Sequence, residues 1–264
     1  GGKEPNMGSN LINTFNDVAK DHWAAPYVEY CVSQGIVGGV GGGNFNPNGN
    51  ITGTQAAKML LCILGYNASI QGYIGNDFWE TKINVDAAQK GLYEGLADID
   101  ASAALTRDQA AQMIWNALQA NEVEYVTTLV TGPDGTLVSK VTVQDKVSND
   151  DLKTKITLLA DKYKALVKYG YMTKVEYSDV KGEYTYTFVD AANTFGGAVI
   201  TTDNYSGKLT TTKDYSDLFG QKVAVVYKDN NDKTVYGMYA ESTVLASDIV
   251  GNITNTSGNP VASG

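Results

Sequence analysis

The spacing of hydrophobic residues changes near Asn121 and divides the chain into a helical part and a strand-rich part. Before this point, apolar residues recur every three to four positions, which is typical of amphipathic helices. After it, they alternate with polar residues in short runs separated by Gly, Asp and Asn, which is typical of antiparallel strands. We therefore expect an α+β multidomain chain, with all-α helical repeats at the N-terminus followed by a β-rich antiparallel barrel or sandwich.

The first helical unit is predicted to hold two helices joined by a glycine-rich loop. Asp21 is the candidate N-cap of the first helix, and Gly35 is its expected end. Thr52 and Gln55 have the spacing of a capping box at the start of the second helix, which Gly65 should end. The expected apolar faces comprise Ala24, Tyr27, Val28 and Cys31 in the first helix and Ala56, Leu60, Ile63 and Leu64 in the second.

The second helix of this unit recurs later in the chain. The segment Ile51–Leu64 aligns with Leu105–Leu118 at a shift of 54 positions, which indicates an internal repeat. Thr106 and Gln109 repeat the capping box, while the middle of the second copy is degenerate because Ala97–Asp100 replaces the glycine-rich loop. The repeated apolar stripe comprises Ala110, Met113, Ile114, Ala117 and Leu118, with Trp115 expected to pack beside it.

The strand-rich part is predicted to form about seven or eight strands. Pro133, Asp134 and Gly135 supply the turn of its first hairpin. One helix interrupts the strands at 151–164. The expected strands are 123–130, 136–144, 166–177, 183–189, 198–202, 208–212, 222–228 and 234–240.

Charge and hydropathy narrow the classes of partner. The 264 residues carry a net charge of −9 and have a pI near 4.6. An acidic chain lacks the basic surface that binds nucleic acid or anionic membranes, so neither partner is expected. No apolar run approaches the ~18 to 20 residues needed to cross a bilayer, so no membrane span is expected. The chain begins without an initiator methionine, and we interpret it as mature or trimmed.

The distribution of chemically active residues argues against catalysis. His22 is the only histidine in the chain. This nearly excludes a Ser-His-Asp or Cys-His catalytic site and excludes a multi-histidine zinc site. The acid pairs Asp98/Asp100 and Asp150/Asp151 lie in expected loops, where capping or solvation explains them better than glycoside hydrolysis. Residues 122–264 contain no His, Cys or Arg. We therefore predict that the protein is not an enzyme.

No cofactor or metal is expected. Calcium is the one ion considered, because carboxylate and amide oxygens occur close together at Asp229–Asp232 and at Asp98 with Asp100. Neither group has the spacing of a dedicated calcium loop, and tight turns explain both better. Cys31 and Cys62 lie on the two expected helices of the first unit and form either two buried thiols, the preferred interpretation, or a disulfide.

Several short elements of the first unit follow the order and spacing of a known family. They are Phe15-x-Asp17-Val18, His22-Trp23-Ala24, Gly35-Ile36-Val37-x-Gly39, Gly43-Asn44-Phe45-Asn46-Pro47 and Ile51-Thr52, followed by an alanine-rich helix ending in Leu64-Gly65. This unit resembles the S-layer homology (SLH) domain. With the change of spacing, the resemblance divides the chain into a lead-in at 1–14, a first SLH-like module at 15–66, a second, degenerate module at 67–121, a β-rich domain at 122–252 and a linker or tail at 253–264.

The resemblance implies an exported protein held at the bacterial cell wall or S-layer by secondary cell wall polysaccharide. In the family, a Thr-Arg-Ala-Glu motif places its arginine against an anionic sugar substituent, at a helix N-terminus that favours anions. The first copy here reads Thr52-Gly53-Thr54-Gln55 and lacks the arginine, whereas the second reads Thr106-Arg107-Asp108-Gln109 and keeps it. The implied glycan-binding residues are Arg107, Thr106, Asp108, Trp23 and Thr52, and His22 is implied to be structural.

Arg107 is the only arginine in the chain. A cation in the first turn of a helix is slightly unfavourable to the helix dipole, so ligand binding explains its position better than stability does. The leading hypothesis is a cell-surface or S-layer protein whose modules bind wall polysaccharide and whose β-rich domain self-associates or is displayed. The alternatives are a surface adhesin whose β-rich domain binds host protein or glycan, and the anchor region of a larger exported enzyme.

Overall fold

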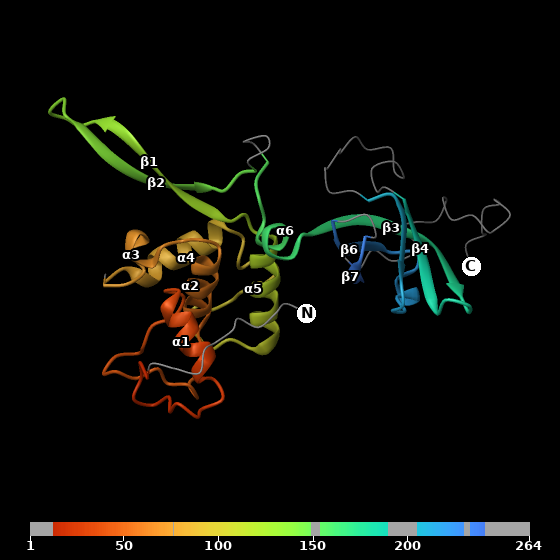
Figure 1. Ribbon diagram of the computed structural model, residues 1–264, viewed down its shortest axis with the longest axis horizontal. Coiled ribbons are helices and arrows are strands. Elements are labelled where there is room, and N and C mark those ends of the chain that lie inside the picture. The colour runs from red at the N-terminus through yellow and green to blue at the C-terminus, as the bar shows by residue number, and fades with distance from the viewer. Residues whose placement is uncertain (1–12, 76, 149–153, 190–204, 230–232, 241–264) are drawn as a thin grey trace. The chain divides into compact units, whose positions relative to one another are not determined.

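The computed structural model describes residues 13–75, 77–148, 154–189, 205–229 and 233–240 (Figure 1). The chain divides into two compact units, Gly1–Leu158 and Leu159–Gly264. The first unit holds helices and a β-hairpin, and the second holds a five-stranded antiparallel sheet. This arrangement confirms the predicted α+β class. Among the described residues, no helix is long and apolar enough to span a membrane.

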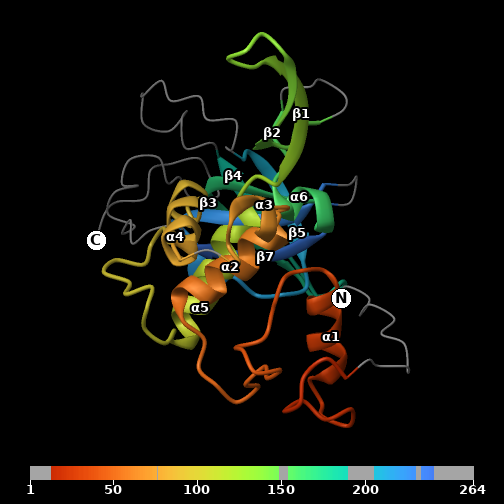
Figure 2. The ribbon, with the colours of Figure 1, turned by 90° about the vertical axis from the view of Figure 1, so that its left-hand side faces the viewer.

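The helices of the first unit build two cores. Three of them, α2, α4 and α5, pack around a shared core in which Leu61, Ile83 and Met113 are fully buried. The helices of both predicted modules therefore contribute to one core. A smaller core under α1 comprises Phe15, Val18, Ala25 and Val28. The helix bounds are α1 (Ala25–Ser33), α2 (Gly53–Ile63), α3 (Ala68–Gln71), α4 (Trp79–Gln89) and α5 (Arg107–Gln119) (Figures 1 and 2).

Both predicted capping boxes are confirmed. At the start of α2, Thr52 Oγ1 accepts a hydrogen bond from Gln55 N at 3.3 Å, and Gln55 Oε1 accepts one from Thr52 N at 3.0 Å. At the start of α5, the corresponding distances between Thr106 and Gln109 are 3.1 and 2.9 Å. Gly65 follows α2 with a φ of +106°, a conformation that favours glycine, as expected for a helix end.

The structure corrects the prediction for α1. The N-cap is Ala24 rather than Asp21, and no side chain caps the helix. His22 Nδ1 instead accepts a hydrogen bond from Ala24 N at 3.2 Å, which agrees with a structural role for this histidine. Ala25 and Val28 are buried while Tyr27 is 45% exposed, because the helix packs on the chain segment before it.

The buried faces of α2 and α5 also differ from the predicted stripes. Ile63 and Ile114 are exposed, at 41% and 53%, whereas Ala57 and Leu61 are fully buried. The reason is that α2 packs against both α4 and α5, so its buried surface is rotated toward the space between two neighbours. Trp115 is half-buried.

A β-hairpin completes the first unit. Its strands β1 (Val123–Thr131) and β2 (Leu137–Asp145) pair antiparallel, with Thr128 opposite Lys140. The helix expected at 151–164 is shorter, since α6 spans only Leu158–Tyr163. Residues 154–157 instead form isolated bridges, Lys155 with Val147 and Thr157 with Asn121, because this segment pairs with the base of the hairpin.

The second unit is a sheet with the strand order β5-β4-β3-β6-β7, and every neighbouring pair is antiparallel. One face of it carries a core in which Tyr186, Phe188 and Val223 are almost completely buried. The Tyr186 hydroxyl accepts a hydrogen bond from Tyr215 N at 2.7 Å and donates one to Lys213 O at 3.2 Å. The bounds are β3 (Ala165–Ser178), β4 (Glu183–Val189), β5 (Gly207–Thr211), η1 (Ser216–Leu218), β6 (Lys222–Lys228) and β7 (Val235–Ala240).

Among the described residues, the strands form a two-stranded hairpin and a five-stranded sheet rather than one barrel or sandwich of about seven or eight strands. The edge strands of the sheet, β5 and β7, approach within 8 Å between Cα atoms, which indicates that the sheet curls around its core. The strand expected at 198–202 lies outside the described residues. The first expected hairpin belongs to the helical unit, so the division between units falls after Leu158 rather than at the predicted boundary between 121 and 122. It does so because the base of the hairpin packs into the helical core through Val123.

Candidate functional site

The structure places the N-termini of α2 and α5 side by side. Thr52 forms an antiparallel bridge with Ala104, and Leu105 N donates a hydrogen bond to Ile51 O at 2.9 Å. Two of the predicted glycan-binding residues, Thr52 and Thr106, therefore stand at neighbouring helix starts. Each threonine already uses its hydroxyl oxygen as a helix cap.

The two helix starts differ in access. At α2, Gly53 N and Thr54 N donate to the carbonyl groups of Ala103 and Ala101 at 3.3 and 2.8 Å. A Cβ atom added at Gly53 would lie 2.9 Å from the Cα of Ala101, too close for any side chain without movement of the backbone. The first copy therefore lacks the arginine for a steric reason, and backbone carbonyl groups already occupy its helix N-terminus.

The start of α5 is open to solvent. Thr106, Arg107 and Asp108 are all exposed. Within the described part of the chain, no carboxylate lies within ion-pair distance of the Arg107 guanidinium. In the part of the chain that the structure describes, this helix N-terminus thus presents a cation without a carboxylate partner beside the backbone N–H groups of the first turn, a combination suited to an anion.

A buried polar network holds the covered helix start in place. The Thr54 hydroxyl is 3.1 Å from both Asn84 Oδ1 and Ala101 O, and the Tyr93 hydroxyl donates to Asn84 Oδ1 at 2.7 Å. Thr54 is 3% exposed. Burial raises the pKa of Tyr93 to about 12, so its hydroxyl remains a donor at physiological pH.

A groove of about 660 Å³ lies between the loop before α2, one side of α2 and the start of α4. We call it the Lys58 groove. Lys58 is the only charged residue among the described residues that line it, and Trp79 and Tyr73 supply aromatic rings. Amide side chains add hydrogen-bonding capacity. The polar lining residues include Asn46, Asn50 and Gln55.

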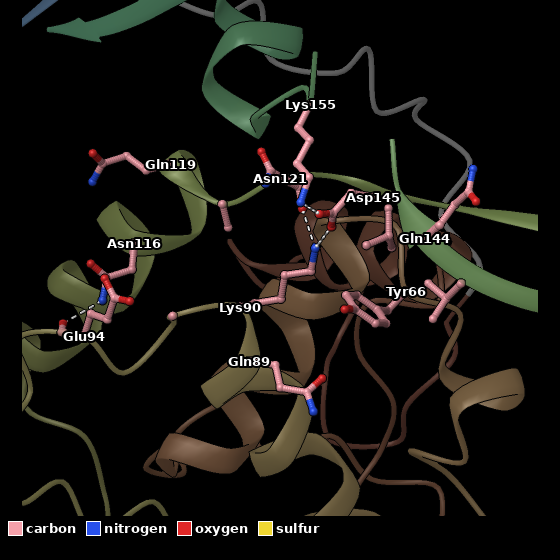
Figure 3. A pocket seen from close by; sticks show the side chains of 14 residues that line it. Tyr66, Gln89, Lys90, Glu94, Asn116, Gln119, Asn121, Gln144, Asp145 and Lys155 are labelled. Carbon is pink, nitrogen blue, oxygen red and sulfur yellow. Dashed lines mark hydrogen bonds and ion pairs between the residues drawn. The ribbon is translucent and has the colours of Figure 1, made fainter. Parts of the chain in front are cut away.

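A second cavity, of about 650 Å³, lies at the base of the hairpin near the ends of α4 and α5 (Figure 3). Asp145 accepts hydrogen bonds from Lys90 at 2.5 Å and from Lys155 at 2.6 Å. The charged lining residues are Lys90, Lys155, Glu94 and Asp145, so their charges cancel. This cavity therefore offers no net charge to an ionic ligand.

The Asp145 carboxylate is partly buried within this cluster. Desolvation by burial opposes its ionised form, but the hydrogen bonds from Lys155 and Lys90 outweigh it and lower the pKa of Asp145. Lys90 also donates to Asn121 O at 3.1 Å. The cluster therefore ties α4 to both strands at the base of the hairpin.

The remaining candidate residues lie apart from the helix starts. Trp23 is 80% exposed, and its ring neighbours are His22 and Tyr27, with no hydrogen bond or ring contact to Thr52 or Thr106 among the described residues. Its glycan-binding role stays a prediction. Cys31 and Cys62 are free thiols, both partly exposed, and burial raises the pKa of each.

Of the candidate calcium residues, Asp100 makes hydrogen bonds within a local turn. Asp100 accepts hydrogen bonds from Ser102 N at 2.9 Å and from Ser102 Oγ at 2.6 Å, and these bonds lower its pKa. No cluster of three or more His, Cys, Asp or Glu residues suited to a metal occurs in the described ranges. Part of the second group, 230–232, lies outside the described residues.

The sequence interpretation missed the Lys58 groove. Lys58 lies one turn after the capping box and reads as an ordinary polar position of an amphipathic helix. Trp79 begins α4 after a connector without regular periodicity, so its approach to α2 depends on a tertiary contact. One signal was available in the sequence. The first copy lacks the arginine of the family motif at Gly53 but carries a lysine, Lys58, later in the same helix.

Comparison with known proteins identifies the family of the segment that contains the glycine-rich loop and the start of α2. Residues 14–57 match the S-layer homology domain family. A cell surface protein of Thermoanaerobacter kivui is 22% identical over 92% of this chain and 36% of its own length. An uncharacterized cell wall amidase of Bacillus anthracis is 32% identical over 38% of this chain and 20% of its own length. The middle cell wall protein of Brevibacillus brevis is 26% identical over 45% of this chain and 10% of its own length.

These relatives are longer proteins, of which the chain spans about a third or less. The family match covers the glycine-rich loop and the capped start of α2, the elements on which the resemblance rested. The repeated capping box at α5 extends the same local structure into the second module. The chain thus carries an S-layer homology domain, and the proteins it resembles are cell surface and cell wall proteins of bacteria.

Proposed function

We propose that the first unit anchors the protein to the cell wall by binding an acidic secondary cell wall polysaccharide. The observation that carries this proposal is the Lys58 groove: among the described residues that line it, the only charged one is a cation, in a chain of net charge −9. A polyanion meets repulsion over most of such a chain, so the groove is a favoured place for contact.

The chemistry of the groove fits a sugar with an anionic substituent. Trp79 offers an apolar ring for the face of a pyranose, and the amides of Asn46, Asn50 and Gln55 supply donors and acceptors for hydroxyl groups. Lys58 supplies the positive charge for a carboxylate. Arg107, at the open start of α5, provides a second cationic contact and a planar fork suited to a carboxylate.

Co-sedimentation with purified cell wall sacculi tests the proposal. The full chain should pellet with intact sacculi and remain in solution once the wall polysaccharide has been stripped. Lys58→Gln should weaken binding severalfold because it removes the charge of the groove while keeping a long polar side chain. Lys82→Gln is the matched control, since Lys82 is exposed on α4 and does not line the groove. Equal loss in both variants would mean that only net charge matters.

The Arg107→Ala variant separates the two cationic contacts. We expect binding to fall severalfold while the melting temperature stays within a few degrees, because exposed substitutions usually change stability by under ~0.5 kcal/mol. Parental binding by this variant together with reduced binding by Lys58→Gln would assign recognition to the groove alone. Parental binding by both would refute polysaccharide recognition at either place.

The β-rich second unit is proposed to be the assembled or displayed part of the surface protein. The similarity to a cell wall amidase favours one alternative, in which this chain is the anchor region of a larger exported enzyme. In both hypotheses this chain has no catalytic activity of its own, and a screen of the chain against peptidoglycan and glycosides tests that expectation. We expect no turnover, since the second unit contains no histidine, cysteine or arginine to act as base, nucleophile or electrophile.

A further inference from the structure

The base of the hairpin is fixed to the helical core. Val123 N donates to Leu64 O at 2.8 Å, and the Tyr125 hydroxyl accepts hydrogen bonds from Asn67 N at 2.8 Å and Gln71 Nε2 at 3.1 Å. At the end of β2, Asp145 pairs with Lys90. The hairpin is therefore held in a defined direction by contacts at its base.

Beyond this base, the hairpin extends from the helices as a two-stranded ribbon, which we call the hairpin arm (125–143; Figures 1 and 2). Leu129 and Leu137 are 68% and 69% exposed. The register places them with Val141 and Val143 on one face of the ribbon. A hairpin with only two strands is marginally stable in water, and a sheet with an apolar face needs three or more strands for independent stability, so additional strands would stabilise the arm.

The outer edge of β1 has open backbone groups. Val123 N bonds to Leu64 outside the hairpin, whereas Gly132 N bonds to Thr136 O across the turn at 2.7 Å. Because the direction of backbone groups alternates along a strand, the outward N–H and C=O groups of β1 belong to the odd-numbered residues. Within the described residues these groups have no partner strand. They are Tyr125, Thr127, Leu129 and Thr131.

The charges of the arm favour contact between identical copies. Two copies of a chain with a net charge of −9 repel each other over most of their surface, but residues 125–143 carry only Asp134 and Lys140 and are neutral overall. The segment Tyr125–Thr131 contains no charged residue and no proline, two of the features that normally protect an edge strand from pairing. Lys140 lies within β2, so β1 is the unprotected edge.

We propose that β1 pairs with β1 of a second copy of this chain, antiparallel about a twofold axis at Thr128. This register places Thr127 opposite Leu129 of the second copy and Tyr125 opposite Thr131 of the second copy. The backbone groups of the odd-numbered residues then face each other, and residues 125–131 of the two copies bring no charges together. The product is a four-stranded sheet, β2-β1-β1-β2, with a continuous uncharged face. This interface does not depend on the proposed binding of polysaccharide.

Cross-linking tests the pairing directly. In the full chain with Cys31→Ser and Cys62→Ser, Thr128→Cys should form a disulfide-linked dimer on mild oxidation, because paired Cα atoms in antiparallel strands are about 4.5 to 5.5 Å apart. The matched control is Lys140→Cys, since Lys140 lies directly opposite Thr128 on the other strand of the same arm. In the proposed dimer the two copies of residue 140 are three strands apart, about 14 Å, which is too far for a disulfide.

A second pair of variants tests the interface without cross-linking. In sedimentation velocity experiments, Leu129→Lys should raise the dimer dissociation constant at least about tenfold because it places a charge beside the axis in each copy. Ser139→Lys, its cross-strand neighbour on β2, should change it much less. A parental chain that stays monomeric at high concentration overturns the proposal. So does equal or faster cross-linking through position 140, or a Leu129→Lys variant that dimerises like the parent.

Discussion

Replacing Tyr186 with phenylalanine tests how the core of the second unit is held together. The side chain is fully buried, and the change removes one oxygen atom while keeping the ring. That oxygen accepts the hydrogen bond from Tyr215 N, a buried contact of 2.7 Å. Without it, the Tyr215 N–H loses its hydrogen-bond acceptor. A buried donor left without an acceptor costs about 1 to 3 kcal/mol, so we expect a loss of about 2 kcal/mol in unfolding free energy.

Two spectroscopic signals allow this loss to be assigned to one unit. All three tryptophans, Trp23, Trp79 and Trp115, lie in the first unit, so their fluorescence reports on the helical core. Near-ultraviolet circular dichroism is dominated in the second unit by tyrosines. In urea titrations, Tyr186→Phe should shift the tyrosine transition to lower denaturant and leave the tryptophan transition in place.

The matched control is Tyr177→Phe. Tyr177 is 54% exposed, and its ring contact with Tyr184 at 4.6 Å does not require the hydroxyl. This variant should differ from the parent by less than ~0.5 kcal/mol. A Tyr186→Phe protein as stable as the parent would show that the Tyr215 N–H finds another acceptor. Equal shifts in both transitions would show that the two units unfold together.

Three further predictions concern the first unit. The pKa of Asp145 is lowered below its usual 3.8, so the stability that it contributes is present above that pH and is lost as the pH falls through the folded value; acid titration of tryptophan fluorescence should therefore be less steep in Asp145→Asn. The pKa of Tyr93 is raised from 10.0 to about 12, so its contribution is present below pH 10 and is lost as the pH rises through about 12; absorbance at 295 nm should show Tyr93→Phe with less late-titrating tyrosine than the parent. Thr106→Ala should cost about 1 kcal/mol in thermal unfolding, whereas Thr106→Ser should retain the cap and most of the stability.

Local signals in the sequence were sufficient for the capping boxes of α2 and α5 and for some of the strands. The Thr-x-x-Gln pattern defined the starts of α2 and α5, because a capping box is formed by residues three positions apart. The predicted strands 183–189 and 222–228 agree with β4 and β6 to the residue. In β4 the alternation of side chains was decisive, and in β6 the signal was a continuous apolar run between two lysines.

Features that depend on distant contacts could not be predicted in the same way. The periodicity of 151–164 indicated one helix, but its described first part pairs with the hairpin base through Lys155 and Thr157. The missing arginine at Gly53 read as a lost binding residue, although contact with Ala101 requires a glycine there. The Lys58 groove likewise exists only because α4 packs near α2.

The shared core of the first unit has a consequence for how such modules are moved between proteins. Leu61 of the first module packs with Ile83 and Met113 of the second, and the core extends to Val123 and Leu158. A repeat defined by sequence is thus not an independent folding unit with boundaries of its own. Recombination or fusion that ends after Gly65 or Asn121 would leave apolar surface exposed to water and to proteases. The smallest transferable unit runs to Leu158 and includes the hairpin arm, so any protein that acquires this unit also acquires the arm.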